Sequence, residues 1–393
     1  MSFDLSKPFR VFFFVWLLTI FLYQLSLTSN IVESNAETWL LLGTCVVVMY
    51  LTSIEFKTSS SSLIRDVIGR EIGSRSNIFL WRLFVFWIFG TAIDVLYSGG
   101  IPIFWIVTGA GKNYTEFGVP SFHGVVNAAY LFLATSLFLK YLIFRRKSFF
   151  IGFLLLLLWP VFMLGRGILL GVLVQCLGVY LVLNKVRLSN IFYLMVLGVV
   201  VVVVFGVLGN VRSEGNVLEY LVPSGGVLEF LPDGFLWVYV YITTGVNNIF
   251  YSYPSIDPVG YPFYSVLNLL PSAVKNFLGN FQLNESLVQL VDDNLNTSTF
   301  LSGYVSDFGY VGGIFGSAIL GVVARIFYSA AKSGRFGGVI GFSVIFQCLV
   351  FSPFYDMLFL LPTIFQLGIS AWYILFAKPD VGVRLLNKNS LPT

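Results

Sequence analysis

Basic residues beside apolar segments are the most unusual chemical feature of this sequence. Arg166 stands in the turn Leu164-Gly165-Arg166-Gly167 between two apolar segments, and Arg212 directly follows a third. A guanidinium near hydrocarbon is costly without an anionic partner, and its planar donors suit a diphosphate. Lys112 and Lys275 are weaker candidates of the same kind. These residues predict a diphosphate site, with local pairing to an acid or snorkelling to water as the alternative.

Three residues near apolar segments are candidate general bases. His123 is the single histidine of the chain, and Glu116 lies seven residues before it. Either side chain can accept the proton of a hydroxyl group. Asp307 opens a later apolar segment, where the alternative is a carboxylate that stabilises a helix start. Asp94, inside an apolar segment, is either an internal hydrogen-bond anchor or part of a proton path.

Aromatic side chains and one acidic cluster complete the list of candidate ligand groups. Trp237, Tyr239 and Tyr241 suit stacking on sugar rings, and equally suit a belt at the membrane interface. Asp292-Asp293-Asn294 resembles a metal-ligand set, but Asp and Asn at this position favour capping of a short helix. We therefore expect no bound metal and no cofactor.

The composition assigns these residues to a membrane protein. Of 393 residues, 57% are hydrophobic and 11% are charged, whereas roughly 25% are charged in soluble domains. The mean hydropathy is +0.86. Apolar runs near the ~20 residues that span a bilayer recur along the chain. This excludes a soluble globular protein, and the lack of a basic block argues against nucleic-acid binding.

The apolar runs predict an all-α polytopic membrane protein with about ten transmembrane helices. Because cytoplasmic loops retain Lys and Arg, both termini are predicted to be cytoplasmic. Of the 23 Lys and Arg residues, this orientation leaves only Lys112, Arg166, Arg212 and Lys275 on the outer side. The predicted spans cover residues 9–29, 37–54, 79–97, 122–144, 148–164, 168–184, 190–209, 304–328, 337–354 and 357–377.

Two outer segments interrupt this pattern. Residues 98–121 form a short outer loop whose seven-residue apolar piece predicts an interfacial or re-entrant element. Residues 210–303 contain six prolines and apolar pieces such as 235–242 that are too short to span, which predicts a folded external cap. The domains are thus spans one to seven in 1–209, the cap, spans eight to ten in 304–378, and a tail in 379–393.

The order of several short motifs resembles the oligosaccharide repeat-unit polymerases, the Wzy-like O-antigen polymerases of bacteria. The resemblance covers residues 90 to 315. The motifs are Gly99-Gly100-Ile101-Pro102, Tyr114-Thr115-Glu116-Phe117-Gly118, His123-Gly124, Gly165-Arg166-Gly167, Trp237-Val238-Tyr239-Val240-Tyr241-Ile242-Thr243, Ser298-Thr299-Phe300 and Asp307-Phe308-Gly309.

The resemblance implies a membrane glycosyltransferase of the GT-C type that joins repeat units carried on undecaprenyl diphosphate. It implies a periplasmic site in the inner membrane and a role in lipopolysaccharide biosynthesis. Arg166 and Arg212 would hold the leaving diphosphate, and Glu116 or His123 would accept the proton of the attacking hydroxyl. The implied partners are the lipid-linked oligosaccharide, the bilayer and a membrane protein that regulates chain length.

Two other functions stay open at this stage. O-antigen ligases share the architecture and donor, but they are expected to use a histidine in a late periplasmic loop, and no histidine follows His123. A lipid-linked oligosaccharide flippase or another transporter would need polar or charged residues through many spans. Apart from Asp94 the predicted spans are almost free of internal charge, which favours chemistry at one face over transport.

Overall fold

The structure is a computed structural model of the chain. It describes residues 2–3, 6–54, 61–71, 74–184, 186–187, 198, 233–271, 274, 287–292, 295 and 297–376. Arg212, Lys275 and nearly all of the predicted span 190–209 lie outside these residues.

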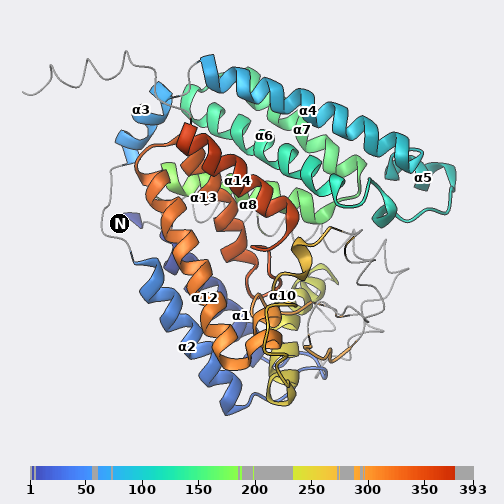
Figure 1. Ribbon diagram of the computed structural model, residues 1–393, viewed down its shortest axis with the longest axis vertical. Coiled ribbons are helices and arrows are strands. Elements are labelled where there is room, and N and C mark those ends of the chain that lie inside the picture. Colours follow the sequence, from blue (N-terminus) through green and yellow to red (C-terminus); the bar gives the residue numbers. More distant parts are fainter. Residues whose placement is uncertain are drawn as a thin grey trace, which may run out of the picture.

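The described part of the chain is almost entirely helical (Figure 1). A two-stranded antiparallel ladder joins β1 (Ser2–Phe3) to β2 (Val186–Arg187). The helices are α1 (Pro8–Gln24), α2 (Ala36–Ser53), α3 (Ser61–Glu71), α4 (Ser74–Ser98), α5 (Pro102–Thr108), α6 (Phe122–Phe144), α7 (Lys147–Phe162), α8 (Arg166–Leu183), α10 (Asp233–Ser252), α12 (Ser302–Lys332), α13 (Phe336–Phe351) and α14 (Leu361–Phe376), with short 3₁₀ turns η1 (Tyr114–Glu116), η4 (Tyr253–Ser255) and η5 (Leu267–Leu269).

Apolar composition and helix length mark the chain as a helical membrane protein. Among the residues that the structure describes, five helical stretches are long and apolar enough to cross a bilayer: Ala36–Ser53, Ser76–Thr108, Phe122–Phe144, Arg166–Leu183 and Ser302–Lys332. Four shorter helices are also apolar: α1, α7, α13 and most of α14. Helices satisfy their own backbone hydrogen bonds, which is what a hydrocarbon environment requires.

α13 is the central helix of the bundle. It packs against α12, α8, α14 and α1, and nearly every side chain from Phe336 to Leu349 is buried. α2 and α12 lie side by side, whereas α4, α6 and α7 form a second group whose axes diverge from that pair (Figure 1). α8, α13 and α14 lie between the two groups and join them into one core.

The predicted cap contains a longer helix than its apolar run suggests. Residues 235–242 belong to α10, a 20-residue helix that packs against α1. The helix continues because its polar residues find partners. Asn247 accepts a hydrogen bond from Val32 N–H at 2.9 Å, and Asn248 donates to Leu295 O at 2.9 Å. These amides fasten α10 to the α1–α2 loop and to the segment before α12.

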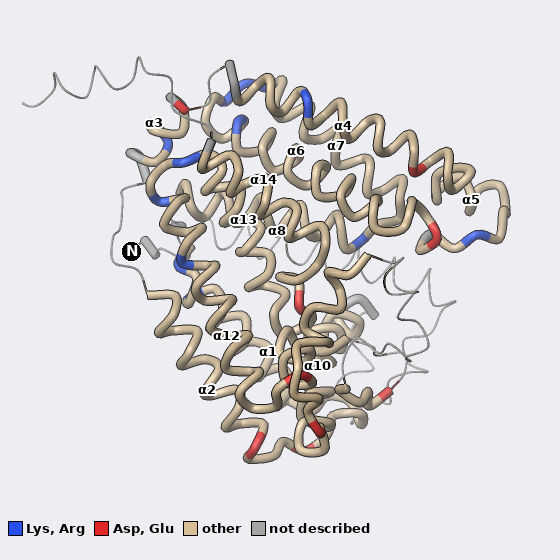
Figure 2. The backbone as a smooth tube through the Cα atoms, viewed as in Figure 1, with Lys and Arg blue, Asp and Glu red and all other residues tan. Residues whose placement is uncertain are grey.

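Charges of opposite sign gather at opposite ends of the helices (Figure 2). One side holds helix ends with basic residues: Arg10, Lys140, Arg145, Arg146, Lys147, Arg325, Lys332 and Arg335. The other side holds connections with acidic residues: Glu33, Glu37, Glu116, Asp257 and Asp356. In α3, however, Asp66 and Glu71 lie at the basic side, where Glu71 accepts a hydrogen bond from Phe336 N–H at 2.6 Å.

Candidate functional site

A tight turn places Arg166 as the first residue of α8. α7 ends at Phe162, Leu164 adopts φ of 53°, and Gly165 N–H donates to Pro160 O at 2.8 Å. α7 has 16 residues, which at ~1.5 Å per residue is shorter than the ~30 Å hydrocarbon core. The turn leaves Arg166 partly buried between the end of α7 and the start of α8.

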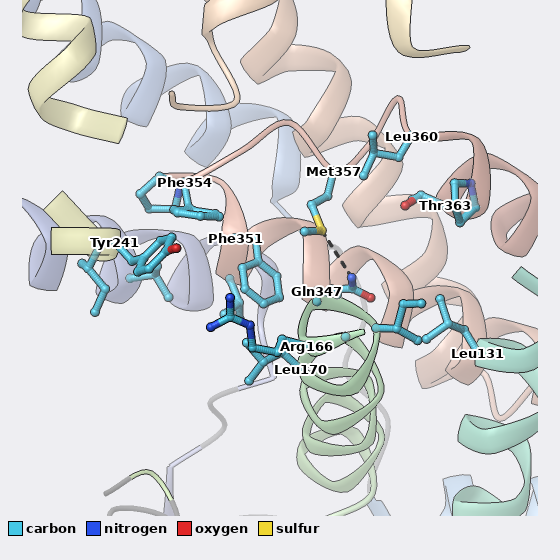
Figure 3. Close-up of a pocket in the computed structure, with 18 of the residues that line it drawn as sticks. Leu131, Arg166, Leu170, Tyr241, Gln347, Phe351, Phe354, Met357, Leu360 and Thr363 are labelled. Carbon is cyan, nitrogen blue, oxygen red and sulfur yellow. Dashed lines mark hydrogen bonds between the residues drawn. The ribbon is translucent and has the colours of Figure 1, made fainter. Parts of the chain in front are cut away.

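A cavity of about 770 Å³ opens beside this turn (Figure 3). Its volume is within the range of small-molecule sites. The walls come from α1, α6, α8, α10, α13, α14 and the α13–α14 connection. The lining is mainly apolar: Val15, Leu18, Leu131, Leu164, Ile168, Leu170, Val238, Ile242, Val350, Phe351, Pro353, Phe354, Met357, Leu360 and Pro362.

Few polar groups face this cavity. Arg166 is the only charged residue among the described residues that line it. Figure 3 shows its guanidinium near Phe351, with Tyr241 beyond it on the same side of the cavity. Gln347 and Thr363 lie toward the other side. An apolar cavity with one guanidinium suits a lipid whose headgroup is anionic.

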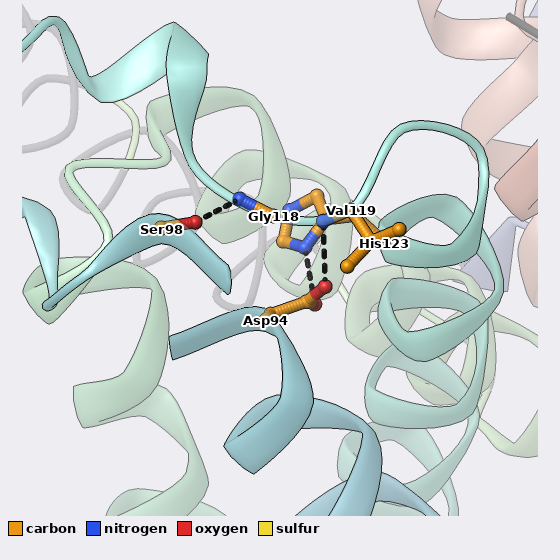
Figure 4. Close-up of polar contacts among 5 residues, drawn as sticks. All are labelled: Asp94, Ser98, Gly118, Val119 and His123. Atoms are coloured by element: carbon orange, nitrogen blue, oxygen red, sulfur yellow. Dashed lines mark hydrogen bonds and ion pairs between the residues drawn. The ribbon is translucent and has the colours of Figure 1, made fainter. Parts of the chain in front are cut away.

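Asp94 and His123 form a hydrogen-bonded pair at the ends of α4 and α6 (Figure 4). Asp94 Oδ2 lies 2.8 Å from His123 Nδ1, and Asp94 Oδ1 accepts a hydrogen bond from Val119 N–H at 2.9 Å. The carboxylate is 1% exposed and the imidazole 22% exposed. Since a carboxylate accepts, Nδ1 donates and Nε2 remains as the basic atom. This is how a general base is oriented by a carboxylate.

The loop before α6 is built around this imidazole. Gly118 has φ of +94°, and a Cβ at this position would lie 2.5 Å from the ring of His123. Gly118 N–H also donates to Ser98 Oγ at 2.8 Å (Figure 4). Phe117 packs edge-on against the imidazole at 5.4 Å between centroids. The glycine therefore allows the loop to close over His123 and hold it against α4.

The histidine pair lies next to the cavity wall and outside the cavity lining. Gly124, which follows His123, packs against Leu361 at the start of α14. Leu360 and Pro362, on either side of Leu361, both line the cavity. His123 is therefore near the part of the cavity wall formed by the start of α14, whereas Arg166 lies toward the other side of the cavity (Figure 3).

Lys112 and Glu116 lie on the outer loop away from the cavity lining. Lys112 Nζ donates to Ser98 O at 2.9 Å and lies 5.4 Å from the centroid of Trp105. These contacts fasten the loop. Glu116 is exposed in η1, and no hydrogen bond of its carboxylate is found within the described part of the chain. Between Glu116 and His123, the geometry favours His123 as the base.

Asp307 has the contacts of a structural anchor. Its carboxylate accepts hydrogen bonds from the backbone N–H groups of Phe263, Tyr264 and Ser265 at 2.7 to 3.0 Å, and from Ser265 Oγ at 2.5 Å. The side chain is fully buried. It holds the loop before α12 exactly where the helix is interrupted, at Phe308 and Gly309. These four donors leave the carboxylate poorly placed to accept a proton from a substrate.

The three predicted aromatic residues of α10 have different surroundings. Tyr241 lines the cavity, and the ring of Trp237 packs against it in a tilted arrangement at 5.8 Å between centroids. Tyr239 is buried, and its hydroxyl oxygen accepts a hydrogen bond from Leu27 N–H at 3.0 Å. Burial raises the pKa of this phenol. Tyr241 is therefore the aromatic residue placed to contact a ligand, and Tyr239 anchors the helix.

The sequence analysis did not single out several polar residues near the cavity. Gln347, Thr363 and Gln366 line it, and each is an uncharged residue within an apolar run. Asp356 lies on the α13–α14 connection between Phe354 and Met357, and burial raises the pKa of its carboxyl to about 7. The sequence did contain one signal for Asp356, because an acidic residue in a short connection between two apolar runs is unusual.

Arg212, Lys275, Asp293 and Asn294 lie outside the described residues. Within the ranges that the structure describes, no three His, Cys, Asp or Glu side chains gather in a metal-binding group. No family model matches the chain, and no curated protein or solved structure matches it.

Proposed function

We propose that this protein is a membrane glycosyltransferase that polymerises oligosaccharide repeat units carried on undecaprenyl diphosphate. The acceptor's hydroxyl oxygen attacks the anomeric carbon of the donor glycan, and the bond from that carbon to the diphosphate oxygen breaks. The electron pair leaves with undecaprenyl diphosphate, and the hydroxyl proton passes to a base on the protein. The product is an O-antigen-type polysaccharide.

The observation that carries the proposal is Arg166 in the wall of an apolar cavity of about 770 Å³. A polyprenyl diphosphate combines a hydrocarbon chain with two phosphates, and the cavity combines apolar walls with one guanidinium. Arg166 holds the departing diphosphate through charge-assisted hydrogen bonds. Arg212 is proposed for the same role on the strength of the family resemblance.

His123 is the proposed base, with Asp94 as its positioning residue. The 2.8 Å contact to Asp94 leaves Nε2 of His123 to accept the hydroxyl proton. Tyr241 and Trp237 cover the sugars. The buried carboxylate stabilises the imidazolium that forms when the proton arrives.

The proposed site is periplasmic, in a bacterial inner membrane protein with ten spans and cytoplasmic termini. The clustering of Lys and Arg at one side of the helices supports this orientation. Arg166 and His123 lie at the opposite side, which is where lipid-linked repeat units are joined in this class of pathway.

One observation favours a second candidate function, transport of the lipid-linked oligosaccharide. Thr135, Gln175, Gln347 and Gln366 form a hydrogen-bonded chain inside the bundle, and buried polar groups in membrane helices often mark a transport path. The chain is short and uncharged, and it ends at the cavity. It therefore supports transport less strongly than Arg166 supports group transfer.

Deletion of the gene in its native bacterium, followed by a gel of the surface glycolipids, distinguishes the candidates. A polymerase predicts that the ladder collapses to one repeat unit on the lipid core. Loss of every repeat unit would contradict the proposal. In that case, polymer retained on the periplasmic carrier would indicate a ligase, and carrier-linked single units on the cytoplasmic side would indicate a flippase.

A further inference from the structure

Three buried glutamines meet inside the bundle beside the cavity. Gln175 of α8 donates through Nε2 to Gln347 Oε1 of α13 at 2.7 Å and to Gln366 Oε1 of α14 at 3.1 Å. Thr135 of α6 donates its hydroxyl to Gln175 Oε1 at 2.8 Å. All four side chains are at least nine-tenths buried. Four helices are thus joined by one small amide cluster.

This cluster fixes the direction in which the Gln347 amide points. Because Thr135 donates to the Gln175 oxygen, the Gln175 nitrogen is left to donate to its neighbours. The Gln347 oxygen accepts that bond, so its nitrogen faces away from Gln175. Gln347 lines the cavity, and Met357 Sδ lies 3.3 Å from its Nε2 (Figure 3).

The acceptor that Gln347 has in this structure is a poor one. A thioether sulfur accepts hydrogen bonds weakly, whereas an amide nitrogen carries two hydrogens to donate. In a membrane interior an amide N–H without a good acceptor is costly. A ligand oxygen in the cavity would replace this weak contact with a stronger bond. The amide and Arg166 both offer donors, so they select a group rich in acceptors.

Gln347 of α13 lies beside α8, at a point along that helix beyond Arg166. Its Nε2 packs against Gly171, where a Cβ would lie 3.1 Å from it. Gly171 is five residues beyond Arg166, about 7.5 Å along the helix at ~1.5 Å per residue. The two donors therefore bracket an extended headgroup.

We infer that Gln347 binds the substrate in this cavity, by donating its amide N–H to an oxygen of the headgroup whose diphosphate Arg166 holds, and that Gln175 orients it. The inference rests on the proposed function and adds a binding residue to it. The acceptor is an oxygen of the diphosphate or the acetamido oxygen of an N-acetylated sugar attached to it.

Equilibrium binding to the purified full chain in detergent micelles tests the inference. The probes are undecaprenyl diphosphate and the same lipid carrying N-acetylglucosamine. Gln347→Met keeps the side-chain size and removes the donor, and it is expected to weaken binding by about tenfold. Gln347→Glu provides a second variant, because its carboxylate repels the diphosphate and should weaken binding further. The exposed Gln24→Met is the matched control, with unchanged affinity expected.

The two probes identify the acceptor. Weaker binding of both probes by Gln347→Met assigns the contact to the diphosphate, and weaker binding of the sugar-linked probe alone assigns it to the sugar. Wild-type affinity of Gln347→Met and Gln347→Glu for both probes overturns the inference and leaves the proposed function standing. If the wild-type protein binds neither probe, the proposed function fails and the inference fails with it.

Discussion

At the scale of single residues, the surroundings of each charge decide what it can do. Arg166 faces an apolar cavity, where an anion is strongly attracted to a guanidinium because little water screens the pair. Asp307 and Asp94 are both carboxylates, but four donors of the 263–265 loop bind the Asp307 carboxylate, whereas the Asp94 carboxylate contacts an imidazole. The contacts therefore separate a structural carboxylate from one that can orient a base.

The histidine pair predicts how polymerisation responds to substitution. His123→Ala removes the proton acceptor and should lower the polymerisation rate by about 10² to 10³-fold. Asp94→Asn leaves the ring without its carboxylate and should lower the rate by a smaller factor. The measurement is the rate at which purified protein extends lipid-linked repeat units. Glu116→Gln is the control, and a loss of rate in that variant with His123→Ala unaffected would contradict the assignment.

Asp356 predicts a pH-dependent stability. Burial raises the pKa of this carboxyl from 3.8 to about 7, with Tyr304 and Cys348 as the titratable groups that face it. Between those two pH values the folded chain keeps the proton and the unfolded chain releases it, so stability falls as the pH rises. Asp356→Asn should remove this fall in the free energy of unfolding, which is on the order of 4 kcal/mol over the whole window.

Thermal unfolding in detergent micelles at pH 5 and pH 8 provides the measurement. The wild-type protein should unfold at a lower temperature at pH 8 than at pH 5, and Asp356→Asn should reduce that difference. The same difference in both proteins would show that Asp356 titrates near its ordinary value.

Single residues show what a sequence alone can and cannot point to. Arg166 and His123 stood out in the sequence because a charge or a lone histidine beside an apolar run is rare. The contact between Asp94 and His123 was not, because 29 residues separate them and only the packing of α4 on α6 joins them. Gln347 carries no charge, so it did not stand out in the sequence. Its proposed role depends on how three helices pack together, which the sequence does not show.

At the scale of elements, hydrophobic runs predict where the helices lie. They do not predict how far a helix extends into polar sequence. Most predicted spans coincide with a helix. In lipid the backbone N–H and C=O groups need hydrogen-bond partners within the segment, and a helix supplies them. α10 was underestimated because its second half contains Thr and Asn. These side chains bond to its own backbone and to neighbouring loops, as Thr244 does to Val240 O at 2.7 Å. Tertiary contacts, which a linear pattern does not contain, extend this helix.

The hydrogen bonds of Asp307, beside the break in α12, predict how its substitution changes the free energy of unfolding. Asp307→Asn replaces an acceptor with an amide that faces the donors of the 263–265 loop, so the folded state should lose about 1 to 3 kcal/mol. Thermal unfolding in micelles measures the change, and the exposed Asp257→Asn serves as the control. An Asp307→Asn protein of wild-type stability that cannot polymerise would instead assign Asp307 to the chemistry.

At the scale of the whole molecule, the distribution of charge supports the proposed orientation of the helices in the membrane. Most basic helix ends and most acidic connections lie on opposite sides (Figure 2). The exceptions are α3, which carries acids on the basic side, and Lys112 and Arg166, which lie on the acidic side. Positive residues are retained in the cytoplasm, so the cavity beside Arg166 should open toward the periplasm. This pattern was predictable from sequence, since it needs only the order of apolar runs and basic residues.

Cysteine labelling tests the orientation. Cys45, Cys176 and Cys348 are buried, so the wild-type protein should react little with a membrane-impermeant maleimide. Glu116→Cys should label in intact spheroplasts, and Arg146→Cys should label only after the membrane is opened. Both positions are exposed, which makes them matched sites on opposite sides. The reverse pattern would contradict the proposed topology.

The central claim is that Arg166 stabilises a departing diphosphate, and complementation of the deletion strain tests it most directly. The glycolipid ladder should collapse to one repeat unit with Arg166→Ala, through a rate loss of about 10² to 10³-fold. Arg166→Lys keeps the charge and should retain a shortened ladder, and the exposed Arg146→Ala should restore full length. A ladder of normal length from Arg166→Ala, at wild-type levels of inserted protein, would contradict the account.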